Sequence, residues 1–191
     1  MSGEPGEVPL LWSDEDPQRL ERDRQEIGAF APLMQISEPG ADVQFLHGRW
    51  VGEIPRWPFD RDEPAGLDRL LRGDQFKVVM VYPSAYPMTP PRLYPANVKP
   101  ELEEHSQGIW HVSPDGSLCL LQSTGGWRPE ASATEMLMKA AGWRIEYALM
   151  KAGTIDEMTI NGIVSDPVHD ALIAGFANAP VTDADADRSD E

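Results

Sequence analysis

The first clear pattern along the chain is an amphipathic segment in its N-terminal part. Leu20, Ile27 and Phe30 recur at helical spacing, and charged residues occupy the remaining faces. Ahead of them, Asp16 is of a type that caps helices and Pro17 suits the first helical position. The pattern predicts a helix that ends near residue 30 and packs its apolar stripe on a sheet.

Four segments rich in β-branched and aromatic residues follow this helix and predict strands. They are residues 43–46, 50–54, 76–82 and 92–94. Their order predicts a four-stranded antiparallel meander. Residues 55–74 contain several prolines and charges and are interpreted as a loop insertion, in which Leu67, Leu70 and Leu71 predict one helical turn.

The best-marked helix in the sequence begins at Ser132. Ser132 and Glu135 have the spacing of a capping box, and the helix is expected to run to about Lys151. Its apolar residues form two adjoining stripes, which is typical of a central core helix. They are Leu137, Ala141, Ile145, Ala148 and Leu149 in one stripe, and Met136, Ala140, Trp143 and Tyr147 in the other.

A last helix is expected to open at Asp166 and Pro167. Four apolar residues are predicted to face inward from it: Val168, Leu172, Ile173 and Phe176. The segment 179–191 that follows is acidic and has no apolar period, so it is interpreted as a disordered tail.

Length and element order predict one α+β domain. The chain has 191 residues, which is an ordinary size for a single domain and small for two. We assign a flexible N-terminus to residues 1–12, the folded domain to residues 13–178 and the acidic tail to residues 179–191.

The net charge of the chain makes some classes of binding partner unfavourable. Thirty-two acidic residues against 16 basic ones give a formal net charge of −16, which disfavours nucleic acid and anionic membrane surfaces. No apolar run has the length of a membrane span, and the first residues lack a signal-peptide pattern. We therefore expect a soluble, cytoplasmic protein.

Cys119 is the only cysteine, so an internal disulfide and a multi-thiolate zinc site are excluded. The four histidines are too scattered to indicate a metal cluster, and we expect neither a metal nor a cofactor. Taken alone, a cysteine between two leucines is more often a buried core residue than a nucleophile.

Two segments change that interpretation. Residues 82–91 hold four prolines within Tyr-Pro-Ser-Ala-Tyr-Pro-Met-Thr-Pro-Pro, which forbids helix and imposes an extended turn. Residues 116–120 then read Gly-Ser-Leu-Cys-Leu, and Trp127 and Pro129 follow. In this order and spacing, the two segments resemble the ubiquitin-conjugating enzyme family, over roughly residues 20–150.

The resemblance implies a fold and a reaction. The fold has an N-terminal helix, a four-stranded antiparallel meander, a central core helix and a C-terminal helical extension. The reaction is transfer of a ubiquitin-like protein from an activating enzyme to Cys119 as a thioester, and then to a lysine of a target protein. Sulfur suits this role because it is both a good nucleophile and a good leaving group.

One departure from the family pattern lies ahead of the cysteine. The family usually has an asparagine eight residues before it, and this chain has His111 there. In the family the asparagine donates a hydrogen bond to the oxyanion, and a histidine N–H has the same capacity. Histidine here resembles the bacterial branch, found beside ubiquitin-like proteins or in antiphage operons.

The resemblance also suggests roles for neighbouring residues. Gly116, Leu118, Trp127 and Pro129 are expected to form the active-site loop and its scaffold. Met88 at the tip of the proline turn and Pro129 are candidates for ligase binding. Arg19, Arg22 and Arg24 on the first helix are candidates for contacts with the activating enzyme. Asp156 and Glu157 are candidates, by order alone, for the acid that assists the incoming lysine.

Two alternatives stay open at this level. One is an inactive variant that only binds a ubiquitin-like protein, although such variants generally lose the cysteine. The other is a thiol hydrolase that uses Cys119 with His111 as its base, for which the sequence offers no clear third residue and no use for the proline turn.

Overall fold

The computed structural model describes residues 10–106, 108–121, 126–159 and 167–178, and within them the fold is α+β. Four antiparallel strands form one sheet in chain order. They are β1 (Gln35–Ser37), β2 (Arg49–Ile54), β3 (Phe76–Val81) and β4 (Arg92–Pro95). The α-helices are α1 (Trp12–Glu15), α2 (Pro17–Phe30), α3 (Leu67–Leu70), α4 (Ala133–Lys151) and α5 (Asp170–Gly175).

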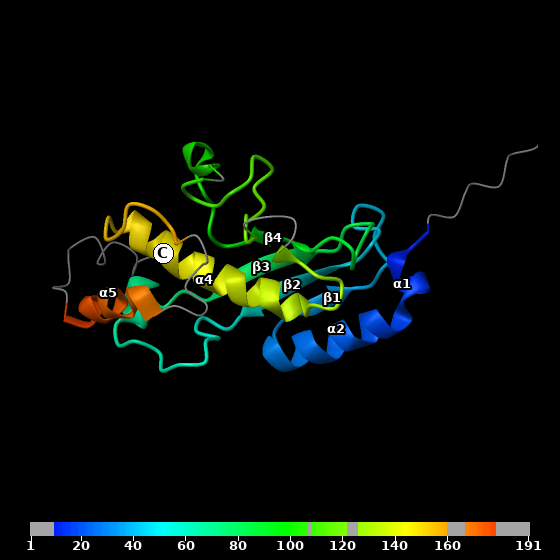
Figure 1. Cartoon of the computed structure of the whole chain (residues 1–191), viewed down its shortest axis with the longest axis horizontal. Coiled ribbons are helices and arrows are strands. Elements are labelled where there is room, and N and C mark those ends of the chain that lie inside the picture. Colours follow the sequence, from blue (N-terminus) through cyan, green and yellow to red (C-terminus); the bar gives the residue numbers. More distant parts are fainter. Residues whose placement is uncertain (1–9, 107, 122–125, 160–166, 179–191) are drawn as a thin grey trace, which may run out of the picture.

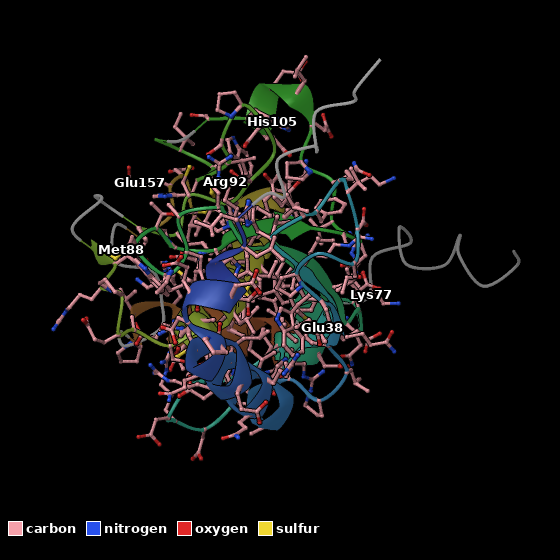
Figure 2. The ribbon with its side chains drawn as sticks, turned by 90° about the vertical axis from the view of Figure 1, so that its right-hand side faces the viewer. Glu38, Lys77, Met88, Arg92, His105 and Glu157 are labelled. Carbon is pink, nitrogen blue, oxygen red and sulfur yellow. The ribbon has the colours of Figure 1, made fainter. Side chains whose placement is uncertain are left out.

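Alternation along the strands decides which face of the sheet is covered. Phe76, Val78 and Met80 of β3 are buried, whereas Lys77 between them is exposed. Helices α2 and α4 lie on the buried face (Figure 1), and Lys77 points away from them (Figure 2). The sheet therefore has one face in the core, as expected for an antiparallel meander.

The two long helices begin as their sequences predict. Asp16 accepts a hydrogen bond from the backbone N–H of Arg19 at 3.0 Å, and Pro17 is the first residue of α2. Ser132 and Glu135 form both halves of the capping box of α4. The apolar stripes of α4 pack into the core, where Leu137, for example, is fully buried.

A second, smaller core joins the insertion to the C-terminal part of the chain. Leu67 of α3, Leu149 of α4 and Ile173 of α5 are fully buried in it. Gly66 adopts a φ of +99°, and a Cβ there would lie 2.6 Å from the carbonyl oxygen of Ile173. The predicted helical turn of the insertion is confirmed, and its function is to support the end of α4.

The first predicted strand, residues 43–46, is wrong. Val43 is 95% exposed, and the side chain of Asp42 accepts a hydrogen bond from the backbone N–H of Gln44 at 2.9 Å, which stabilises a turn. The first strand is instead β1, where Ile36 pairs with Trp50. A strand of three residues gives too short an alternation to stand out in the sequence.

The last helix is correct in place and only partly correct in its inward face. The 3-10 helix η3 (Pro167–His169) leads into α5, and Asp166 lies outside the described residues. Ile173 is buried, but Val168 and Leu172 are 54% and 39% exposed. None of the helices within the described ranges is long and apolar enough to cross a membrane.

Trp12 lies at the end of the segment predicted to be flexible, yet it is 5% exposed. Its ring contacts those of Tyr82 and Tyr86, and its indole N–H donates to the carbonyl of His47 at 2.9 Å. The ordered packing of this domain therefore begins at α1. The expected tail, residues 179–191, lies outside the described residues.

Candidate functional site

The segment around the cysteine forms a small β-hairpin. Val112 and Leu118 form an antiparallel bridge and are both buried. The backbone N–H of Cys119 donates to the carbonyl of His111 at 2.8 Å. This pairing places the cysteine at the end of the hairpin's second strand, opposite position 111.

The turn of the hairpin is held by Asp115. Its carboxylate accepts from the backbone N–H of Ser117 at 3.0 Å and from the Ser117 hydroxyl at 2.7 Å, while Arg92 of β4 lies 3.3 Å away. The Ser117 hydrogen bonds lower the pKa of Asp115 and keep it ionised. Gly116 completes the turn with a φ of +82°, a conformation that favours glycine.

Two further contacts fix the hairpin on the domain. The backbone N–H of Leu118 donates to the carbonyl of Leu93 in β4 at 2.8 Å, so the hairpin continues from the edge of the sheet. On its other side, His105 lies near the carbonyl of Pro114 at 3.4 Å. In Figure 2, His105 lies on the protruding upper loop and Arg92 lies below it.

Cys119 has a free, partly exposed side chain. Its Sγ lies 3.0 Å from the hydroxyl oxygen of Ser113, which belongs to the opposite strand of the hairpin. Val112 and Leu118 are both buried, and alternation places the side chains of Ser113 and Cys119 on the other face of the hairpin. The thiol is thus partly exposed and lies beside a hydroxyl.

His111 contributes its backbone to this arrangement. Its φ of +51° lies in the left-handed region, where asparagine, aspartate and histidine are the enriched residues other than glycine. Within the described residues, its imidazole ring makes no hydrogen bond. The structure therefore accounts for the type of residue at this position, and the oxyanion role of the ring stays a prediction.

The proline turn and the segment after the cysteine support each other. The indole N–H of Trp127 donates to the carbonyl of Pro87 at 2.8 Å, and Trp127 is buried against Tyr86. Met88, at the tip of the turn, is 70% exposed and points outward (Figure 2). An exposed methionine beside a rigid turn suits a contact surface, and the binding role of Met88 stays a prediction.

Arg19 is buried, whereas a residue that binds a partner has to be exposed. It is 5% exposed, and its guanidinium donates to Tyr86 Oη and to the carbonyls of Pro129 and Ala131. It also pairs with the fully buried Asp23 at 3.2 Å. The prediction of Arg19 as a surface contact is therefore corrected: the residue ties α2 to the segment that follows the active-site loop.

Asp23 is the centre of this buried network. Tyr82 and Tyr86 donate to its carboxylate at 2.9 and 2.6 Å, and Trp50 donates to Tyr82 Oη at 3.0 Å. Burial raises the pKa of Asp23, and burial beside that carboxylate also raises the pKa of both tyrosines. The network connects α2, the sheet and the proline turn in one rigid unit.

The remaining predicted residues lie at the surface. Arg22 is partly exposed, pairs with Glu26 at 2.7 Å and donates to the carbonyl of Glu130, so it remains accessible to a partner. Arg24 is exposed and pairs with Glu21 and Glu38. Asp156 and Glu157 are exposed and lie beyond the C-terminal end of α4. Neither makes a hydrogen bond to Cys119 or Ser113 in the described part of the chain.

Sequence reasoning missed Ser113 and Asp115. Residues 113–116 read Ser-Pro-Asp-Gly, a turn signature, and that signal between Val112 and Leu118 could have identified the hairpin. The Asp23 network has no comparable signal, because its members are far apart in the chain.

Comparison with models of known protein families gives no match to this chain. A search among curated proteins also finds no matching sequence.

Proposed function

We propose that the protein is a ubiquitin-conjugating-type enzyme that carries a ubiquitin-like protein as a thioester on Cys119. One observation carries the proposal: the sole cysteine is partly exposed at the end of a hairpin whose position is fixed by the sheet. An accessible thiol of this kind is what an acyl carrier needs, since thioester exchange requires attack by a thiolate.

The motif supports the proposal through its contacts. Trp127, eight residues after the cysteine, packs on the proline turn through the Pro87 carbonyl, and Pro129 is bound by Arg19. The two motif segments thus act as one scaffold, which explains why they would occur together. We also propose that this α+β fold is the fold of ubiquitin-conjugating enzymes.

The reaction we propose has two acyl transfers. The Cys119 thiolate attacks the carbonyl carbon of the thioester on the activating enzyme, a new carbon–sulfur bond forms, and the activating enzyme's thiolate leaves. A lysine amine of the target then attacks the new thioester, loses a proton and releases Cys119 as a thiolate. His111 is proposed to donate a hydrogen bond to the oxyanion that forms in the second transfer, when the amine attacks the thioester.

The partners follow from this chemistry. They are an activating enzyme, a ubiquitin-like protein and a target protein with an accessible amine. The histidine at position 111 favours a bacterial conjugation pathway, and an antiphage pathway is our specific proposal.

Loading of Cys119 tests the proposal directly. The protein is mixed with ATP, an activating enzyme and a ubiquitin-like protein, and an adduct sensitive to reductant is expected. Cys119→Ala should give no adduct, and Cys119→Ser should give an ester that resists reductant. His111→Ala should load normally but discharge to lysine about 100-fold to 1000-fold more slowly.

Two results would refute the assignment. An adduct that persists in Cys119→Ala would show that the cysteine is not the carrier. Release of free ubiquitin-like protein from a model thioester, without an activating enzyme or an amine, would favour a thiol hydrolase.

A further inference from the structure

The closest polar neighbour described for the thiol is Ser113. Its hydroxyl oxygen lies 3.0 Å from Cys119 Sγ, well within the distance of a hydrogen bond to sulfur. Ser113 was not among the residues that the sequence motif singles out. It is on the first strand of the hairpin, two residues after His111.

The backbone of the hairpin fixes the position of this hydroxyl. The N–H of Ser113 donates to the carbonyl of Ser117 at 2.7 Å, and its carbonyl accepts from the N–H of Gly116 at 2.9 Å. Val112, directly before it, is fully buried. The backbone of Ser113 is therefore held on both sides, which keeps its Cβ close to the sulfur and leaves one χ1 rotation to position the hydroxyl.

Ionisation of the cysteine decides which atom donates. With a neutral thiol, either group can be the donor, because both carry a hydrogen. A thiolate has no hydrogen and can only accept, so the hydroxyl must then donate to sulfur. A hydrogen bond to a charged acceptor is stronger than one between neutral groups, and Ser113 therefore favours the ionised form.

We propose that Ser113 is a catalytic residue that donates a hydrogen bond to the Cys119 thiolate. It stabilises the nucleophile before attack and the same thiolate when it leaves in the second transfer, and it keeps its own proton throughout. The role in transfer rests on the proposed function, whereas the effect on the thiol does not. Ser113 and His111 would divide the work, one acting on sulfur and the other on oxygen.

The single cysteine allows a clean test without any partner. The rate of alkylation of the folded protein by iodoacetamide is measured by mass spectrometry over roughly pH 6 to 10, where thiols ionise. The variants are Ser113→Ala, Ser113→Thr and Ser113→Val, of which the last two differ only in the hydroxyl. Ser37→Ala, in β1 at the opposite edge of the sheet, is the matched control.

The expected profiles of Ser113→Ala and the wild type cross. Loss of one charge-assisted hydrogen bond should reduce the thiolate fraction about tenfold at neutral pH. The remaining thiolate is more basic and about threefold more nucleophilic, so alkylation becomes about threefold slower at neutral pH and about threefold faster at the alkaline limit. Ser113→Val should behave like the alanine variant, and Ser113→Thr and Ser37→Ala like the wild type.

Alkylation of Ser113→Ala at the wild-type rate or faster at neutral pH would overturn the proposal, because the thiol would then be the donor or the contact would have no effect. If the alanine variant fails to fold, equal profiles for the valine and threonine variants would overturn it. If the alkylation profiles of Ser113→Ala and the wild type cross but the protein never forms a thioester, the hydrogen bond from Ser113 to the thiolate would stand. The conjugation function alone would be refuted.

Discussion

Replacing Arg19 by methionine tests the buried network that connects α2 to the active-site scaffold. The change keeps an unbranched apolar side chain but removes the guanidinium. Asp23, whose side chain has no solvent exposure, would then lose its cation. The carbonyls of Pro129 and Ala131 would lose their donors as well.

The expected cost is large because the lost charge pair is buried. Removing one partner of such a pair typically costs about 3–5 kcal/mol, compared with about 0–1 kcal/mol for a surface pair. With a urea m-value of about 2 kcal/mol/M, the midpoint should fall by roughly 2 M. Arg22→Met on the same helix is the matched control, since the Arg22–Glu26 pair is partly exposed and should cost less than about 1 kcal/mol.

The deficit of Arg19→Met should also depend on pH. Burial raises the pKa of Asp23 in the folded protein above its pKa in the unfolded chain. As the pH rises above the unfolded pKa, ionisation of this carboxyl therefore favours the unfolded state increasingly. Without Arg19 this effect should grow, and the deficit should therefore be larger at neutral pH than in mild acid. In the double variant Arg19→Met/Asp23→Asn both charges are gone, and most of the lost stability should return.

The assay is urea unfolding followed by tryptophan fluorescence at several pH values. If Arg19→Met is destabilised by no more than Arg22→Met, the guanidinium is not part of a buried network and the reasoning is wrong. A double variant that is as unstable as the sum of its single changes would show that Arg19 and Asp23 are not coupled.

The other predictions concern single contacts. Burial alone would raise the pKa of Glu104, but hydrogen bonds from Lys151 and Tyr147 outweigh it and lower that pKa. Glu104→Gln should therefore lower the free energy of unfolding by about 1–2 kcal/mol at neutral pH. Urea titration should show this deficit vanishing as the pH falls through the lowered pKa. Gly66→Ala should lower the melting temperature and increase hydrogen exchange in α5, because its Cβ would collide with the backbone of that segment. Gly28→Ala, in open space on α2, should instead raise the free energy of unfolding by about 0.5–1 kcal/mol.

Local chemistry explains the parts of the fold that the sequence predicts well. Asp16 with Pro17 and Ser132 with Glu135 satisfy the first backbone N–H groups of α2 and α4 by themselves, so both helices could be located without tertiary information. The strand β3 is equally clear, because the segment is rich in β-branched and aromatic residues. The motif around Cys119 is likewise a local pattern.

Tertiary structure decides the rest. A charged residue on an amphipathic helix is expected at the surface. Arg19 is buried only because Asp23 on the same helix, Tyr86 and two carbonyls converge on it, and those carbonyls are 110 and 112 residues further along the chain. The contact between Ser113 and Cys119 is local, six residues apart, but it forms only where the bridge between Val112 and Leu118 brings the two side chains together. The sequence alone determines which residues are able to form helices and which atom is able to carry an acyl group, but the free energy of a buried charge and the neighbours of a thiol depend on what the folded chain brings next to them.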